Sequence, residues 1–163
     1  MNTISNRIKN FLIFASFFVS FLSASEQEEI RIEANMFEAS EKQKVSIFTG
    51  NVRVRKGSDE INSSRMKIFF DDDNKPIKYE LFKNVSFVIT AENNSTYTGK
   101  TEKITLYPLE KKYIFSESVE ITELETDRKI KGGEVLLNAK TGNVRILGSH
   151  TKPVVMIFKV NEE

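Results

Sequence analysis

The sequence predicts an all-β protein built from bent strands that stack in layers. Runs of roughly 9 to 14 residues rich in Val, Ile, Phe, Tyr and Thr follow one another after residue 26, the composition of a half-buried pleated surface. No stretch places apolar residues at positions i, i+3, i+4 and i+7 over the length of a helix. Polar turns separate the runs at regular spacing, at residues 40–44, 56–59, 71–76, 91–95, 109–112, 126–128 and 140–143.

Residues 1–25 have the pattern of an export signal. Arg7 and Lys9 form a short basic region, residues 11–22 are an apolar run, and residues 23–25 are small. The apolar run is shorter than the ~20 residues that a membrane-spanning helix needs. We therefore predict a signal peptide over residues 1–25, cleaved near Ser25, and one domain over residues 26–163. Retention of the apolar run as a membrane anchor is the alternative.

Composition excludes several classes of function. The chain has no cysteine, which excludes disulfides, a thiol nucleophile and a thiolate metal site. Cleavage near Ser25 removes two of the 24 Lys and Arg residues and none of the 23 Asp and Glu residues, so the remaining domain is close to neutral. Nucleic-acid binding therefore lacks an electrostatic basis, and we expect no nucleic-acid partner.

The clearest strand unit is residues 45–55, two short alternating runs joined at Gly50. Val45 and Ile47 are the apolar positions before the glycine, and Val52 and Val54 are those after it, so the parity of the apolar positions changes. Such a change exposes the apolar set unless the chain bends or bulges. Gly50 permits a bend because it has no Cβ. We predict a strand that turns a corner with its apolar side inward on both arms.

The same unit recurs along the chain. Val52, Val85 and Val119 occupy equivalent positions about 33 residues apart, and each follows a run that ends in apolar or aromatic residues. A second set of strand-like runs alternates with the first. A loose repeat with two bent strands per unit indicates stacked β-layers. An irregular antiparallel sandwich with chance similarity is the alternative. The last run, residues 153–158, is apolar on both faces, as for a strand at an interface.

Parity along these strands predicts a bulky, continuous apolar interior. Burial of each such side chain contributes ~1.5–3 kcal/mol relative to exposure. The layers either close into a dry core, which suits an inert scaffold, or splay at one edge and present a groove for a lipid chain. The residues that we expect to line this interior are Met36, Ile47, Val52, Val54, Ile68, Phe70, Tyr79, Leu81, Val85, Phe87, Ile104, Leu106, Phe115 and Val119.

Motifs for catalysis are sparse. His150 is the only histidine, so a His-based metal site or triad is not expected. Residues 71–74 are three aspartates followed by Asn74, but the twelfth position of a calcium loop starting at Asp71 is Phe82 where Glu is needed, and a solvated hairpin turn fits better. Carboxylate pairs such as Glu117 and Glu120 alternate with other polar residues, as on the solvent face of a strand. We expect no enzymatic activity, cofactor or metal.

Two triplets match the acceptor pattern for N-glycosylation. They begin at Asn62 and Asn94, and each has an acidic residue two positions earlier, Glu60 and Glu92. This spacing resembles the extended signal of bacterial glycosylation systems, so both asparagines are candidate acceptor sites.

Three short motifs occur in an unusual order. Residues 32–39 (IEANMFEA), 48–54 (FTGNVRV) and 61–66 (INSSRM) follow one another in an exported, cysteine-free chain. In this order they resemble the I-x-A-D-x-F-E, G-N-V-x-V-x-x-G and L-x-A-x-x strands of the OstA-like family of periplasmic lipopolysaccharide-transport proteins (LptA-type). The resemblance covers residues 30–147. Asn35 stands where the family often has Asp, and residues 63–64 are Ser where it usually has Ala.

The resemblance implies an OstA-like twisted β-jelly roll, a taco-like stack of bent antiparallel strands. Its apolar interior would carry lipopolysaccharide acyl chains through the periplasm from the inner to the outer membrane. Similar domains would stack head to tail and dock through edge strands with inner-membrane and outer-membrane transport components of similar β-fold. Residues 30–39 and 154–158 are the candidate end strands. The alternatives are a closed-core structural or adhesive β-solenoid without ligand and an inner-membrane-anchored component of the same transport chain.

Overall fold

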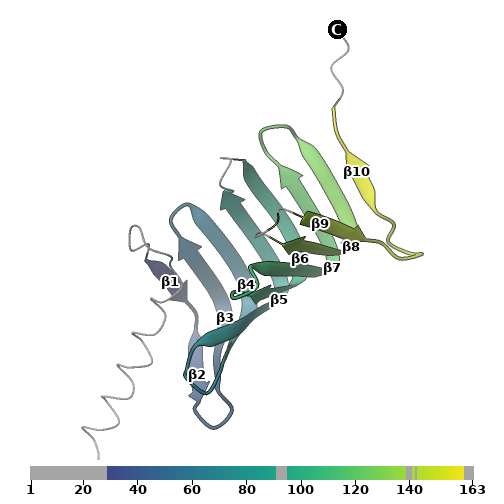
Figure 1. Ribbon diagram of the computed structural model, residues 1–163. Helices are drawn as coiled ribbons and strands as arrows, with labels where there is room; N and C mark the ends of the chain where they lie inside the picture. The colour runs from purple at the N-terminus through teal and green to yellow at the C-terminus, as the bar shows by residue number, and fades with distance from the viewer. Residues whose placement is uncertain (1–28, 91–94, 139–140, 142, 160–163) are drawn as a thin grey trace, which may run out of the picture.

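The computed structural model describes residues 29–90, 95–138, 141 and 143–159, and these residues form one folded antiparallel sheet (Figure 1). The sheet order is β1-β3-β4-β5-β6-β7-β8-β10, with β2 beside β3 and β9 beside β8. The all-β prediction is confirmed, and none of the residues that the structure describes forms a helix able to cross a membrane. The strands are β1 (Ile30–Glu33), β2 (Met36–Ser40), β3 (Val45–Lys56), β4 (Asp59–Phe70), β5 (Pro76–Thr90), β6 (Thr96–Tyr107), β7 (Lys112–Glu123), β8 (Arg128–Asn138), β9 (Asn143–Leu147) and β10 (Val155–Ile157).

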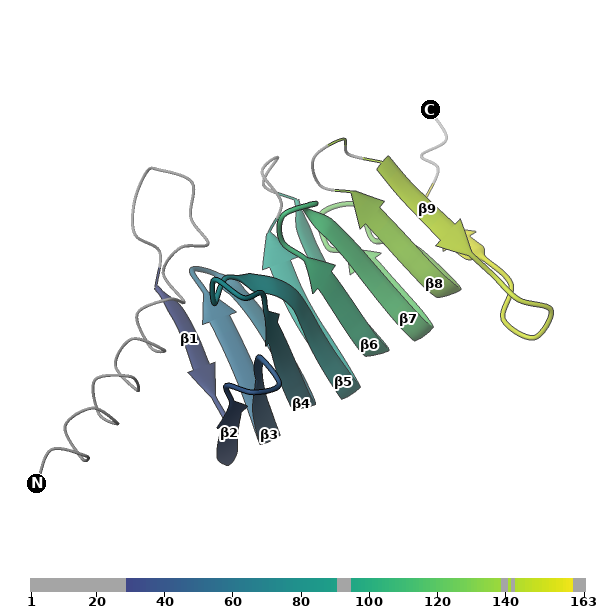
Figure 2. The same cartoon turned by 60° about the horizontal axis from the view of Figure 1, so that its bottom comes forward.

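The six long strands, β3 to β8, each bend once, and the bends lie side by side. The sheet therefore folds into two arms, which Figures 1 and 2 show as two rows of strands stacked along one direction. Arm A holds residues 45–49, 65–70, 76–82, 103–107, 112–116 and 134–138, together with β2 and β9. Arm B holds residues 52–56, 59–63, 85–90, 96–101, 119–123 and 128–132, together with β1 and β10.

The odd-numbered long strands turn the corner through two consecutive residues with positive φ. The pairs are Gly50-Asn51 in β3, Lys83-Asn84 in β5 and Glu117-Ser118 in β7, with φ between 48° and 81°. Only the first pair contains the glycine that the sequence suggested. The residue after each pair is a buried valine, and these are Val52, Val85 and Val119. The spacing of the valines in the sequence therefore corresponds to a structural repeat.

The even-numbered long strands turn the corner with a register shift of one residue and a small inward residue. These residues are Ser63, Thr101 and Gly132, and each pairs with one of the three corner valines. The Ser63 hydroxyl donates to the carbonyl of Arg65 at 3.2 Å, and the Thr101 hydroxyl donates to the carbonyl of Ser116 at 2.6 Å. The hydroxyls thus bond carbonyl groups next to the bulge, and their small side chains leave room for the valines.

The parity predicted across Gly50 differs from the parity in the structure. Because the corner inserts two residues and not one, the inward positions are even-numbered on both sides of it. Phe48 pairs with Met66 and belongs to the core, whereas Ile47 pairs with Lys67 on the opposite face. Val54 faces inward on the other side of the corner, as expected.

The core lies between the two arms. Its eleven most deeply buried side chains are 0–6 % exposed, and they come from β3 to β8. The rings of Phe87 in arm B and Phe115 in arm A connect the arms, with centroids 5.3 Å apart. At one end of the stack β1 and β2 flank the two arms of β3, and at the other end β10 and β9 flank those of β8 (Figure 1).

Candidate functional site

The apolar interior between the arms, here called the trough, gathers most of the residues that the sequence suggested. Twelve of the fourteen expected lining residues belong to one apolar cluster, either buried in it or packed against it. The twelve are Val52, Val54, Ile68, Phe70, Tyr79, Leu81, Val85, Phe87, Ile104, Leu106, Phe115 and Val119. They come from strands β3 to β7, so the cluster runs through most of the stack.

Met36 and Ile47 are placed elsewhere. Met36 is 49 % exposed in the end strand β2 and pairs with Thr49, and Ile47 pairs with Lys67. Ile47 and Thr49, the partner of Met36, both adjoin Phe48 in β3, and Phe48 belongs to the core. Ile47 and Met36 therefore lie on the outer face of arm A. For Ile47 the cause is the two-residue corner at Gly50, and Met36 follows from its pairing with Thr49 on the same face as Ile47.

Beyond those twelve, the cluster has ten further members, which are Ile32, Ala34, Phe48, Ile61, Met66, Ile89, Tyr113, Ile121, Val135 and Ile146. Met66 alternates with Ile68 and Phe70 along β4, a period-two signal that could have identified it. Phe48 is recognisable only from its pairing with Met66 across the β3–β4 ladder.

Burial along the trough decreases from the corner towards the strand tips. Val85 is 0 % exposed at the corner, while Ile89, Leu106 and Ile121, nearer the tips, are only partly buried. Burial raises the pKa of the Tyr79 phenol far above its ordinary value and also raises that of Tyr113. Both phenols therefore stay neutral, and the interior remains apolar.

Charged groups begin where the trough ends. Glu123 is the last residue of β7, at the tip of arm B, and it is almost fully buried. Its carboxylate accepts hydrogen bonds from the Thr126 hydroxyl and from Arg128 Nε, the latter at 2.7 Å. These hydrogen bonds hold the pKa of Glu123 below its ordinary value, and the bond from Thr126 has the largest effect. The Tyr97 hydroxyl is 3.4 Å from the same carboxylate, so this rim combines an ionised group with the edge of the apolar lining.

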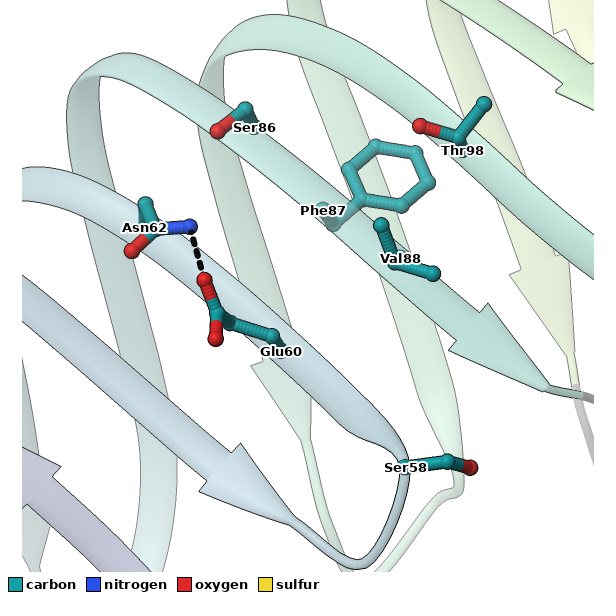
Figure 3. A pocket seen from close by; sticks show the side chains of 7 residues that line it. All are labelled: Ser58, Glu60, Asn62, Ser86, Phe87, Val88 and Thr98. Carbon is teal, nitrogen blue, oxygen red and sulfur yellow. Dashed lines mark hydrogen bonds between the residues drawn. The ribbon is translucent and has the colours of Figure 1, made fainter.

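The outer face of arm B has a shallow hollow of about 450 Å³, on the opposite side of the sheet from the trough (Figure 3). Ser58, Glu60, Asn62, Ser86, Phe87, Val88 and Thr98 line it. Asn62 Nδ2 donates to Glu60 Oε1 at 2.8 Å, and Ser58 Oγ lies 3.5 Å from Thr90 Oγ1. Several of its polar groups are thus already engaged with neighbours, and Phe87 is the one lining residue that belongs to the core.

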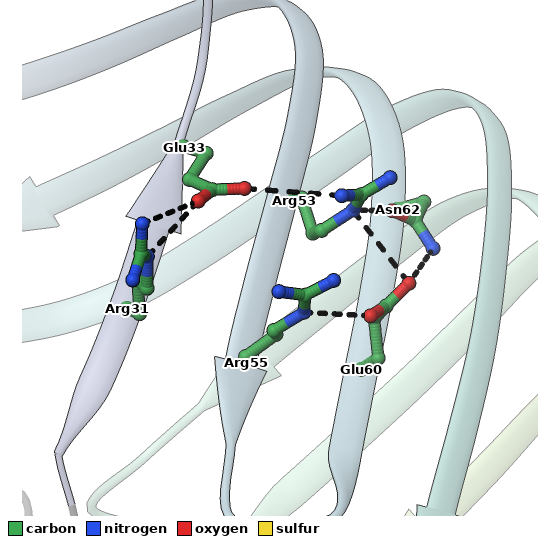
Figure 4. Close-up of polar contacts among 6 residues, drawn as sticks. All are labelled: Arg31, Glu33, Arg53, Arg55, Glu60 and Asn62. Carbon is green, nitrogen blue, oxygen red and sulfur yellow. Dashed lines mark hydrogen bonds and ion pairs between the residues drawn. The ribbon is translucent and has the colours of Figure 1, made fainter.

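A network of charged side chains on the same outer face connects β1, β3 and β4 (Figure 4). Arg53 approaches Glu33 at 3.9 Å and Glu60 at 3.7 Å, and Arg55 Nε donates to Glu60 at 2.8 Å. Hydrogen bonds from Asn62 and then from Arg55 lower the pKa of Glu60. The network joins the short β1 to the stack and leaves the inner face of the sheet apolar.

The two candidate glycosylation sites have different outcomes. Asn62 lies within β4, where its amide oxygen accepts from Arg53 Nε at 3.2 Å and its amide nitrogen, the atom that would carry a glycan, already donates to Glu60. Asn94, like the predicted signal peptide, lies outside the described residues.

Residues 71–75 form a hairpin turn in which Asp71 Oδ1 accepts from Lys75 N at 2.8 Å. Within the described ranges no group of three His, Asp or Glu side chains could hold a metal ion.

Comparison with known proteins gives two findings. The family model described as "LptA/(LptD N-terminal domain) LPS transport protein" matches residues 31–143, more than half of the chain. The fold is similar to that of LptH, the LptA-homologous periplasmic component of the conserved lipopolysaccharide transport device from Pseudomonas aeruginosa, with a TM-score of 0.69 and 14 % identity over 85 % of this chain and 100 % of that one. No curated protein matches the chain in sequence.

Proposed function

The chain belongs to the LptA/(LptD N-terminal domain) LPS transport protein family, and from this premise we propose that it carries lipopolysaccharide acyl chains in the trough. Membership of this family gives it a role in lipopolysaccharide transport and not in catalysis. The observation that supports the proposed site is the apolar cluster, which runs through six strands between the two arms. The twelve clustered residues named above are the proposed lipid-contacting set.

The proposed mechanism is burial without a chemical step. Each CH₂ group of an acyl chain moved out of water is stabilised by ~0.8 kcal/mol. Apolar contact is non-directional, so a chain can slide along such a trough while its contacts are replaced one by one. Sugars and phosphates would remain at the strand tips, where the trough ends in groups such as Glu123 and Arg128.

The carrier role requires a periplasmic location between the inner and the outer membrane. The export signal predicted over residues 1–25 supports that location. We expect the chain isolated from the periplasm to begin near Glu26. A chain found only with the inner membrane, with residues 11–22 retained in its intact mass, would favour the anchored alternative.

The two ends of the stack are the proposed docking surfaces. β10 pairs only with β8 among the described strands, and the five residues from Val154 to Phe158 are all exposed and apolar. β1 and β2 form the opposite end, beside β3. The free edges carry backbone groups that another strand can pair with, so the ends suit head-to-tail addition of a second copy, or docking to membrane-bound components of similar β-fold.

Photo-crosslinking in the cell tests the proposed site. A light-activated residue at Leu106 or at Ile121 faces the trough, and the next residue of each strand, Tyr107 or Thr122, faces outward and serves as the matched control. We expect lipopolysaccharide adducts at the two inward positions only. Silence at all four positions, in protein that is folded and exported, would contradict the carrier function and favour the closed-core scaffold, with which the dry packing of the core is compatible.

A further inference from the structure

One aromatic pair crosses the trough at its centre. Phe87 belongs to arm B and Phe115 to arm A, and their rings lie 5.3 Å apart, inclined at 45°. The two side chains are 3 % and 5 % exposed. The pair therefore fills the space between the arms midway along the stack.

The ring of Phe87 rests on a glycine. Phe87 pairs with Gly99 across the β5–β6 ladder, and a Cβ added to Gly99 would lie 2.4 Å from Cζ of the ring. The backbone of Gly99 is not in the left-handed region, so no turn requires a glycine there. Because Gly99 has no side chain, the ring of Phe87 can lie directly against its backbone. A glycine within a strand allows such a close approach.

The space around this pair is full. Leu81, Val85 and Ile104 are 0–4 % exposed, and interiors at this density have no room for an added chain. An acyl chain can pass the centre only by displacing a side chain. The corner valines are short and directly follow backbone residues held at the bend, whereas Phe87 is long and lies over open backbone.

We propose that Phe87 is a plug that occupies the acyl-chain path in the empty protein and swings away from Gly99 and Phe115 when lipid enters. This inference rests on the proposed carrier function. The plug and the ligand compete for the same space. The apparent Kd is therefore the Kd of the open protein divided by the fraction of molecules in which the plug is open. The plug also keeps the empty trough dry and folded.

The test compares binding of fluorescently labelled lipopolysaccharide to the exported wild-type chain and to two cavity-forming variants. Phe87→Ala removes the plug, and Ile104→Ala, at a site 2 % exposed, is the matched core control. If the open state holds roughly a tenth of the molecules or fewer, Phe87→Ala lowers the Kd by about tenfold or more. Ile104→Ala removes a lining contact without removing the plug, so we expect it to raise the Kd.

The outcomes separate the plug from the carrier function. If the wild type binds and Phe87→Ala has the same Kd, the plug is overturned and the carrier function stays in place. The same holds if Ile104→Ala lowers the Kd as much as Phe87→Ala does. Absence of binding in every folded variant overturns both. Where Phe87→Ala fails to fold, Phe87→Leu keeps most of the volume and removes the ring, and an unchanged Kd for that variant also overturns the plug.

Discussion

The residues at the corners of the sheet are held in backbone conformations that L-amino acids rarely adopt. Gly50 has φ of 81°, and a Cβ there would lie 2.9 Å from Asn35 Nδ2. Asn35 also donates its backbone N–H to the Gly50 carbonyl at 2.9 Å. Asn84, in the equivalent corner of β5, has φ of 53° without being a glycine. The corners are therefore equivalent in geometry and different in strain.

This difference predicts opposite effects of two substitutions. Gly50→Ala should lower the free energy of unfolding by ~1–2 kcal/mol, because it adds a left-handed Cβ that also contacts Asn35. Asn84→Gly should be neutral or slightly stabilising, because it relieves the same conformation. Urea unfolding followed by circular dichroism measures both. Equal losses in the two variants would contradict this account of the corner.

Ile47 and Ile68 test the parity of β3 and β4 with one residue type. Ile68 is 1 % exposed in the trough, whereas Ile47 lies on the outer face beside Lys67. Ile68→Ala should lower the free energy of unfolding by ~2–5 kcal/mol because it leaves a cavity in the core. Ile47→Ala should have a much smaller effect in the same urea titration. A loss as large as that of Ile68→Ala would indicate that Ile47 faces inward, as the sequence suggested.

Among the elements, the hairpin between β7 and β8 has the strongest polar cluster. Glu123 is bonded by Thr126 and Arg128, and the second hairpin acid, Glu125, accepts the backbone N–H of Thr96 at 2.9 Å. The bond from Thr96 lowers the pKa of Glu125, as those from Thr126 and Arg128 lower that of Glu123. This cluster connects the tips of β6, β7 and β8.

The cluster makes a pH-dependent contribution to stability. The pKa of Glu123 is lower in the folded protein than its ordinary 4.5, so the folded state binds the proton less readily than the unfolded state does. The contribution is present above pH 4.5 and is lost as the pH falls below it. We expect Glu123→Gln to lower Tm at pH 7 and to reduce the fall in Tm between pH 5 and pH 3, with Glu117→Gln, exposed at a corner, as the control. A parallel pH profile would contradict this assignment.

The end strand β10 differs from the other elements in its exposure. Met156 is 55 % exposed although it pairs with Ile130 of the long strand β8, and Phe158, which directly follows β10, is 58 % exposed. In the core of the stack such side chains would be covered by the next strand. The exposed apolar run is therefore typical of a sheet edge to which a further strand can pair.

Charges on this strand should prevent end-to-end association. The proposed head-to-tail docking predicts that the wild type associates in light scattering as its concentration rises. Met156→Lys combined with Phe158→Lys places two cations at this end of the sheet, and we expect the double variant to stay monomeric at the same concentrations. Leu109→Lys, at a position 81 % exposed in the β6–β7 turn, is the matched control and should associate like the wild type. Association of the double variant would place the docking surface elsewhere.

At the scale of the whole molecule, two short strands complete each end of one continuous folded sheet. Each of the strands β3 to β8 contributes to both arms, so the arms are joined by covalent backbone at the corners and by side-chain packing in the trough. Side-chain packing is the weaker connection, because it can be exchanged for contacts with a ligand. The arms of the proposed carrier can therefore separate without loss of strand pairing, which is the movement that the proposed plug at Phe87 requires.

The sequence by itself determined the all-β class, the repeat of bent strands and most of the lining, because these depend on local alternation. Val52, Val85 and Val119 show this, since their spacing alone placed three equivalent corners. The tertiary structure decided which face Met36 and Ile47 occupy, since the side that a strand presents after a bend depends on how many residues the bend inserts. It also decided that Phe87 meets Phe115 and rests on Gly99, contacts between residues that lie far apart in the chain and join only when the sheet folds onto itself.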